Sequence, residues 1–221
     1  MVVNFSHRPK WQNRVQVCLN SGPPDYTFRN INRNAQAGIY WQESYAKGSL
    51  ADADNDGDLD LYLTTVYGGD SGDLFENDGS GRFTPVGADL GVRVKNSYQV
   101  NWADVDGDGN MDLIVGGRLF RNGGSGLNRL RVRAVGGAGS NASAVGARVT
   151  VTAGETRQVR EISAGNSGNQ DPFVAHFGLG AHDGPVTVRV RFPSGRIATV
   201  ETRPNLLCTV READALPPAS E

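Results

Sequence analysis

Residues 50–63 (LADADNDGDLDLYL) and residues 102–115 (WADVDGDGNMDLIV) repeat one pattern of alternating aspartates, a glycine turn and an apolar run. The first aspartates of the two copies, Asp52 and Asp104, are 52 residues apart. Each copy is followed by an aromatic residue, an asparagine and a glycine turn, at residues 75–79 and 120–124. A repeat of about fifty residues with short strands has the size of a β-propeller blade.

Alternation of apolar and polar residues at period two predicts strands along most of the chain, whereas helical spacing is scarce. Clusters of Gly, Asn and Asp separate these runs and supply tight turns. The sequence therefore predicts an all-β protein. Strands are expected at residues 58–65, 110–115, 130–135, 147–152, 156–162, 173–177, 186–192 and 197–202.

The repeat divides the chain into two predicted domains. Residues 1–127 hold the blades: the end of one blade at 11–40, a full blade at 41–92 and the start of another at 98–127. These two to three blades make a partial propeller, because a closed ring typically needs at least four. It stays open whether the ring is completed by upstream blades of a longer protein, by a second copy or by the domain that follows. After about residue 128 Asp becomes rare, which predicts a smaller β-sandwich-like domain at 128–210 and a disordered tail at 211–221.

Acidic residues are concentrated in the repeats. The formal net charge of the whole chain is −2, but residues 52–112 carry 14 acidic and 3 basic residues, a net charge of −11. Like charges packed so closely repel one another unless something neutralises them. This asymmetry favours a cation site or a basic partner.

Both copies contain the motif DxDxDGxxD, whose spacing suits a hard cation. A tight loop can present carboxylates from positions 1, 3 and 5 and a backbone carbonyl from position 7, with glycine at position 6 for the sharp turn. The position-9 aspartate then closes the site at the head of the next strand. The expected ligands of two Ca²⁺ ions are Asp52, Asp54, Asp56, Asp58 and Asp60 in the first loop, and Asp104, Asp106, Asp108, Asn110 and Asp112 in the second.

Other interpretations of the loops compete with a calcium site. An EF-hand needs a bidentate Glu at position 12, which falls on Leu63 and Val115, so the EF-hand is excluded. Asp and Gly also gather in ordinary turns, but two matching motifs at a blade-sized offset favour a metal site. Soft metals are disfavoured because the cluster holds neither His nor Cys. Mg²⁺ is the alternative, and the number of carboxylates favours Ca²⁺.

The two loops and the Phe-Asn-Gly turns resemble FG-GAP/VCBS repeats, the calcium-loop propeller blades also found in integrin alpha subunits. From about residue 129 to 203 the chain resembles the ASPIC/UnbV domain, through NRLRV (128–132), AVGARV (144–149), QVRE (158–161), HFGLG (176–180) and VRFPSG (190–195). Proteins with this arrangement, such as those similar to cartilage acidic protein, are generally secreted or attached to the cell surface. The resemblance implies an extracellular calcium-binding module for binding or adhesion, although the first eleven residues, MVVNFSHRPKW, show no signal peptide.

The expected partner is an extracellular glycan or protein. Alternating arginines on two predicted strands, at 129–133 and 189–191, form basic faces that are either solvated, docked on the acidic repeats or available to anionic glycans. Nucleic acid is not expected, because no aromatic residues for base stacking are interleaved with them. No apolar stretch reaches the ~18 residues of a membrane span. Association into homo-oligomers stays open.

A polysaccharide-active hydrolase or lyase with calcium as a scaffold is the alternative function. It rests on His176 and His182, which lie near Asp171 and Asp183 in the sequence. No catalytic signature accompanies them, so structural roles are favoured and no catalytic residue is assigned. The sequence leaves open whether Cys18 and Cys208 are bridged.

Overall fold

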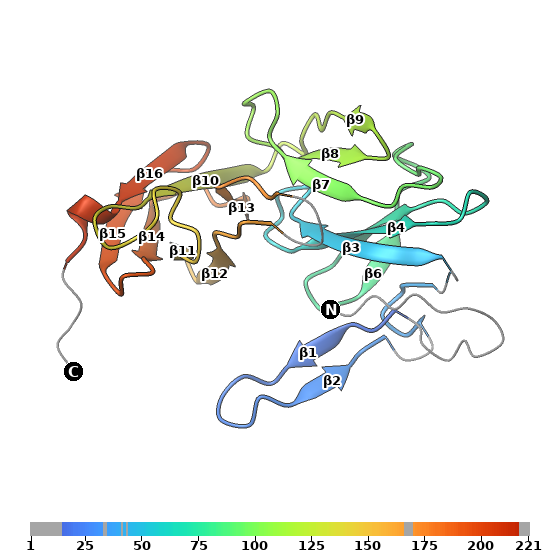
Figure 1. Cartoon of the computed structure of the whole chain (residues 1–221), viewed down its shortest axis with the longest axis horizontal. Helices are drawn as coiled ribbons and strands as arrows, with labels where there is room; N and C mark the ends of the chain where they lie inside the picture. Colours follow the sequence, from blue (N-terminus) through green and yellow to red (C-terminus); the bar gives the residue numbers. More distant parts are fainter. Residues whose placement is uncertain (1–14, 33–34, 41, 43, 166–169, 217–221) are drawn as a thin grey trace. The chain divides into compact units, whose positions relative to one another are not determined.

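A computed structural model of the chain describes residues 15–32, 35–40, 42, 44–165 and 170–216. Within these residues the secondary structure is β-strand, apart from short 3-10 turns such as Glu212–Asp214 (Figure 1). The predicted all-β class is confirmed.

The first complete repeat forms one four-stranded antiparallel sheet in the order β3-β4-β5-β6. Leu61 and Leu63 of the central strand β4 face a core that also contains Tyr45 and Phe75. Tyr62 on the opposite side is fully buried too, so β4 is covered on both faces, as a strand between stacked blades would be. The strands are β3 (Tyr45–Ala51), β4 (Asp60–Thr65), β5 (Asp73–Asn77) and β6 (Phe83–Pro85).

The second repeat forms a three-stranded sheet of β7 (Val100–Ala103), β8 (Asp112–Val115) and β9 (Arg118–Phe120). Upstream, β1 (Cys18–Asn20) and β2 (Phe28–Asn30) pair as two strands. In both repeats the aspartate loop joins the first two strands of the sheet. These sheets agree with the prediction of a partial propeller.

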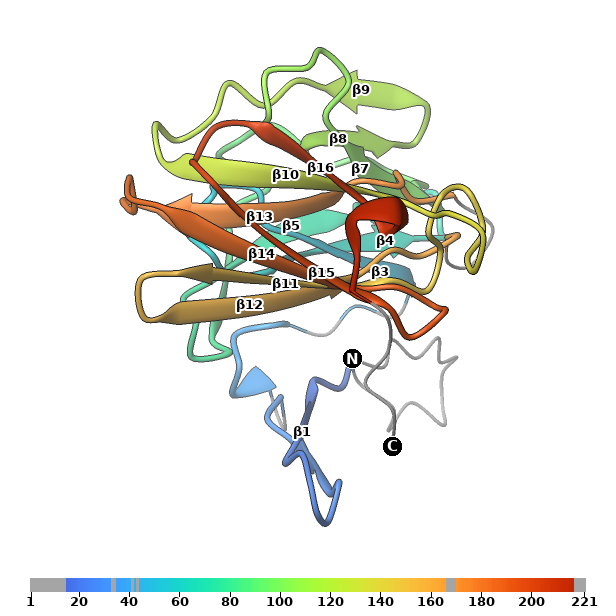
Figure 2. The same cartoon turned by 90° about the vertical axis from the view of Figure 1, so that its left-hand side faces the viewer.

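The C-terminal strands form two sheets around one core. One sheet has the order β13-β10-β16, in which β16 runs parallel to β10, and the other is antiparallel in the order β12-β11-β14-β15 (Figure 2). Alternation decides which side chains enter the core: in β14 Val188 and Val190 are fully buried while Arg189 and Arg191 are exposed. The strands are β10 (Asn128–Val135), β11 (Arg148–Ala153), β12 (Thr156–Glu161), β13 (Ala175–Gly180), β14 (Val186–Arg191), β15 (Ile197–Thr202) and β16 (Leu207–Arg211).

The structure departs from the predicted strands at several places. Strands β4 and β8 begin two residues later than predicted, because Asp58 and Asn110 still belong to the loops. Strand β16 was not predicted; it pairs with β10 from about 76 residues away, as in the pair Arg131 and Leu207. Of the segment 211–221, residues 212–214 form the 3-10 turn and Leu216 bridges to Ile197, while 217–221 lie outside the described residues.

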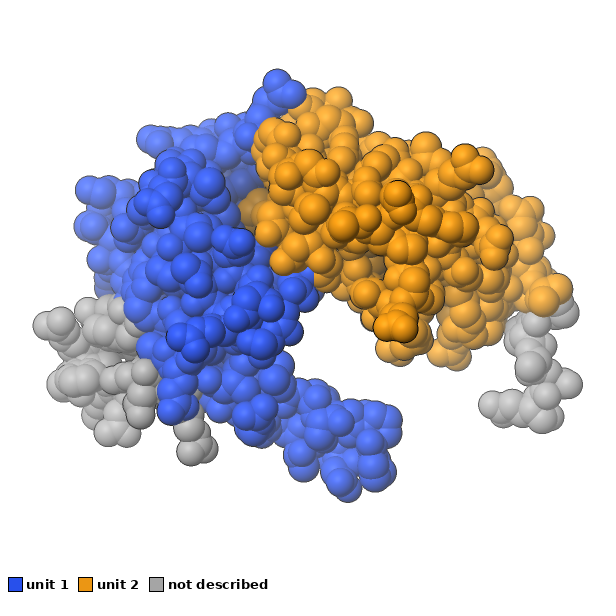
Figure 3. All heavy atoms as spheres, turned by 180° about the vertical axis from the view of Figure 1, so that it is seen from behind, with its two compact units in different colours: residues 1–51, 58–101, 113–121 blue, residues 52–57, 102–112, 122–221 orange. Residues whose placement is uncertain are grey.

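Contacts divide the chain into two compact units (Figure 3). The first comprises residues 1–51, 58–101 and 113–121, and the second comprises residues 52–57, 102–112 and 122–221. Residues 52–57 of the first aspartate loop and all of the second loop therefore belong to the same compact unit as the C-terminal strands, whereas Asp58 and Asp60 belong to the first unit. The domain division predicted at residues 127 and 128 follows the sequence repeat and stays a prediction. Cys18 and Cys208 are both free thiols.

Candidate metal centre

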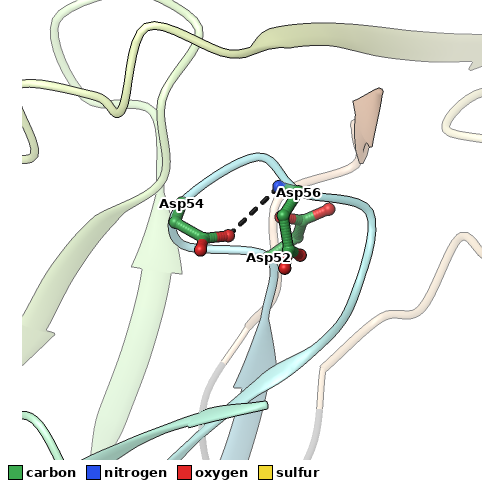
Figure 4. A group of neighbouring side chains, drawn as sticks. All are labelled: Asp52, Asp54 and Asp56. Carbon is green, nitrogen blue, oxygen red and sulfur yellow. Dashed lines mark hydrogen bonds between the residues drawn. The ribbon is translucent and has the colours of Figure 1, made fainter. Parts of the chain in front are cut away.

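The first loop gathers three carboxylates. One oxygen from each of Asp52, Asp54 and Asp56 lies within 4.8 Å of the others (Figure 4). Asp52 is buried, Asp54 half-buried and Asp56 exposed, so the group reaches from the interior to the surface. The Asp54 carboxylate accepts a hydrogen bond from the Asp56 N–H at 3.1 Å, which fixes the tight turn. At position 6, Gly57 has a φ of +107°, a conformation that favours glycine.

The second loop repeats this arrangement. Oxygens of Asp104, Asp106 and Asp108 also lie within 4.8 Å of one another. The Asp106 carboxylate accepts a hydrogen bond from the Asp108 N–H at 3.1 Å, as Asp54 does from Asp56. Gly109 at position 6 has a φ of +94°. The positions predicted to supply carboxylates 1, 3 and 5 are therefore brought together in both loops.

The predicted position-9 residues tie each loop to its following turn. The Asp60 carboxylate accepts the Asn77 N–H at 2.9 Å, and the Asp112 carboxylate accepts the Asn122 N–H at 2.8 Å. The second oxygen of Asp112 accepts the Val105 N–H at 2.9 Å. In both repeats the position-9 aspartate therefore anchors the backbone of the asparagine turn that follows, 17 residues later in the first repeat and 10 residues later in the second.

The position-7 side chains point to those same turns. The Asp58 carboxylate lies against Gly79, and the Asn110 side chain lies so near Gly124 that a Cβ there would be 2.8 Å from its Nδ2. Neither side chain belongs to a three-aspartate group. Their predicted contribution to a metal site is the backbone carbonyl, and that assignment stays a prediction.

The donor set fits a hard cation. Burial raises the pKa of Asp54, and the neighbouring negative charge of Asp56 raises it further. The raised pKa reflects first the unfavourable free energy of holding an ionised carboxylate half-buried and second its repulsion by Asp56, both of which a bound cation would relieve. In the same loop Asn55 Oδ1 is buried with no hydrogen-bond partner among the described residues. Only oxygen ligands are offered, as Ca²⁺ and Mg²⁺ prefer.

Strand β13 holds the first loop from the C-terminal side. The Gly178 N–H donates to the Asp52 carboxylate at 2.8 Å, and the Gly180 N–H donates to the Asn55 carbonyl at 2.9 Å. The Asn55 side chain in turn donates to Asn110 Oδ1 at 2.9 Å, which connects the two loops. The motif HFGLG (176–180) carries no sequence signal that links it to the aspartates.

The second loop is held by β13 and β10. His176 Nε2 lies 3.1 Å from the Gly109 carbonyl, which can only accept, so the Nε2–H tautomer donates there. Arg131 forms an ion pair with Asp104, and Arg129 donates to the Asp108 carbonyl. Of the three alternatives for the arginine face at 129–133, docking on the acidic repeats therefore describes Arg129 and Arg131.

The histidines of the alternative enzyme hypothesis have structural contacts. Burial lowers the pKa of His176 to about 4, against a hydrogen bond to Gly109 that raises it. The imidazole is therefore neutral near pH 7 and bound to loop backbone. His182 Nε2 lies 3.1 Å from the Pro185 carbonyl. These contacts accord with the structural roles favoured from the sequence.

The strands and the paired loops define an all-β protein of the propeller-repeat class with an appended two-sheet domain. Residues 52–115 match the model of the FG-GAP-like repeat, and residues 137–217 match the model of the ASPIC and UnbV domain. The chain thus carries an FG-GAP-like repeat followed by an ASPIC/UnbV domain, and both resemblances are confirmed. None of the curated proteins compared with the chain matches it. The described residues include no helix long and apolar enough to span a membrane.

Proposed function

We propose that the protein is an extracellular binding module whose two aspartate loops each hold a structural Ca²⁺ ion. The observation that carries this proposal is the pair of three-aspartate groups, built alike at the same place in two successive repeats. Asp52, Asp54 and Asp56 would hold one ion and Asp104, Asp106 and Asp108 the other. Bound calcium would neutralise part of the local charge of −11 across residues 52–112 and fix each loop on its strand.

Calcium is favoured over magnesium by the number of carboxylates. Ca²⁺ accepts six to eight oxygen ligands in flexible geometry, whereas Mg²⁺ retains several waters and binds through one or two carboxylates. A ligand that binds only the folded chain stabilises it by ~2.7 kcal/mol at 100 times its dissociation constant. Two such sites would supply a large share of the ~5–15 kcal/mol typical of folded domains.

Asp54→Ala and Asp106→Ala each remove one position-3 ligand and test the sites separately. Each variant is expected to lower the melting temperature in saturating calcium by several degrees and to change it little in chelator, because the carboxylate stabilises the fold through the ion. Asp89→Ala, which removes an exposed aspartate outside both groups, is the control and should behave alike in both buffers. Equal losses in calcium and in chelator would show that Asp54 and Asp106 are not metal ligands.

We propose an anionic glycan as the partner, docked on the outer face of the sheet β12-β11-β14-β15. Arg148 on β11 lies directly opposite Arg191 on β14, and Arg189 lies two residues before Arg191 on the same face of the sheet. All three are exposed, and Glu161 opposite Arg148 is the acidic neighbour in this row. Like charges facing each other across strands destabilise a sheet, so a polyanion that bridges them would relieve the repulsion.

A triple variant, Arg148→Gln with Arg189→Gln and Arg191→Gln, tests this face. Wild-type protein is expected to bind immobilised dextran sulfate saturably and neutral dextran weakly, and the variant to lose about tenfold or more in affinity. The matched control replaces three other exposed arginines, Arg118, Arg203 and Arg211, by Gln with the same change in charge. An equal loss in both variants, or equal binding of an oligonucleotide of the same charge, would refute a glycan site on this face.

Assays with the same glycans also address the alternative functions. Product formation that His176→Ala abolishes would favour the polysaccharide-active enzyme, whereas saturable binding without product supports the module. Sedimentation of the purified chain would reveal a homo-oligomer formed through open sheet edges.

A further inference from the structure

We propose that Arg131 competes with the cation for Asp104, so that calcium binds the second loop only as the guanidinium leaves that carboxylate. This inference rests on the proposed calcium function and adds a built-in regulator to one of its two sites. The second loop would then be a low-affinity site that fills at high calcium, and the arginine would hold it folded when calcium is scarce.

The contacts of Arg131 carry the inference. Its Nη1 forms an ion pair with Asp104 Oδ2, and Nη2 lies 3.5 Å from the Gly107 carbonyl. The side chains of Arg131 and Asp104 are 23% and 8% exposed, so water screens the pair only partly. Asp104 is position 1 of the second loop, and one of its carboxylate oxygens lies within 4.8 Å of oxygens of Asp106 and Asp108, so the ion pair and a bound cation would draw on the same carboxylate.

The other hydrogen bonds of the Asp104 carboxylate show why Arg131, and not the backbone, would compete with a cation. Its Oδ1 accepts the Gly107 N–H at 2.8 Å, and Oδ2 accepts the Gly109 N–H at 3.1 Å as well as Arg131. Peptide N–H groups can stay in place around a carboxylate that also binds a metal. A guanidinium cannot stay without repulsion, because two positive centres would then share one carboxylate a few ångströms apart.

Strand β10 keeps the arginine close to the loop. Arg131 pairs in register with His176 of β13, whose side chain is bonded to the Gly109 carbonyl. Two residues earlier, Arg129 donates to the Asp108 carbonyl and its guanidinium packs against Gly109. The backbone of β10 is thereby fixed beside the loop, so exchange of arginine for calcium requires only that the Arg131 side chain swing away.

Calcium titration of the full chain by calorimetry tests the inference. The second loop is isolated with Asp54→Asn, which disables the first, and Arg131→Gln is then compared with the parent. The dissociation constant of the second loop is expected to fall about tenfold or more when the competing charge is removed. Arg133→Gln is the control, since Arg133 lies on the same strand face but is exposed, and it should change the constant less than twofold.

The melting temperature in two buffers tests the inference even if the Arg131 variant folds less well. Arg131→Gln should lower the melting temperature more in chelator than in saturating calcium, because the ion replaces the lost counter-charge. An unchanged or weaker calcium affinity, or an equal loss of melting temperature in both buffers, would overturn the competition while leaving the calcium sites intact. Absence of calcium binding by the wild-type chain would instead refute the proposed function and this inference together.

Discussion

Gly178→Ala is expected to destabilise the protein by about 2–3 kcal/mol, because the position has no room for a methyl group. A Cβ at Gly178 would lie 2.5 Å from the carbonyl carbon of Asn55 and 2.7 Å from its Cα. It would also collide with the Asp52 carboxylate, which accepts the Gly178 N–H. Since backbone atoms cannot yield as a flexible side chain does, the first loop must shift away from β13.

Chemical denaturation in calcium measures this loss, and calorimetry should show weakened calcium binding at the first loop in the same variant. Gly123→Ala is the matched control, because a Cβ there would meet no atom within 4 Å. If Gly178→Ala were as stable as Gly123→Ala, the docking of the first loop on β13 would be wrong.

The stability of the protein should fall as the pH drops from about 6.5 to about 4, with His176 contributing up to about 3 kcal/mol of the loss. Burial lowers the pKa of His176 to about 4, and the charges of Arg160 and Arg129 lower it further. In the unfolded chain the imidazole has its ordinary pKa near 6.5, so between these pH values the unfolded state takes up a proton that the folded state refuses. Nδ1, which would receive that proton, is buried without a hydrogen-bond partner in the described structure.

The contribution of His176 to the pH dependence of stability is isolated by urea denaturation across this pH range. Wild type and His176→Gln are compared, both in chelator. Glutamine can still donate to the Gly109 carbonyl but does not titrate. The difference in unfolding free energy between the two proteins should therefore change with pH between 6.5 and 4 and be constant above 7. Parallel pH profiles would mean that His176 is not held neutral in the fold.

The sequence predicted the features that depend on local patterns. Aspartates at positions 1, 3 and 5 meet in both loops because a tight turn with glycine at position 6 leaves them little freedom. The core of β14 follows from strict alternation, with Val188 and Val190 inside and Arg189 outside.

Features that depend on residues far apart in the chain could not be predicted from the sequence. Strand β16 is short, and its parallel pairing with β10 leaves no local signal. The bond from Gly178 to Asp52 joins residues 126 positions apart, and the contact of His176 with Gly109 joins residues 67 apart. Nothing in the HFGLG motif distinguishes an ordinary strand end from one that holds two acidic loops.

Thermal unfolding of the wild-type chain in calcium, in magnesium and in excess chelator shows whether the two aspartate loops hold structural calcium ions. At free calcium well above the dissociation constants, two sites would add about 5 kcal/mol, which for a chain of this length corresponds to a rise of roughly ten degrees or more. We expect that rise in calcium and a much smaller one in magnesium. Identical melting temperatures in all three buffers would show that the aspartate loops are turns without a structural ion.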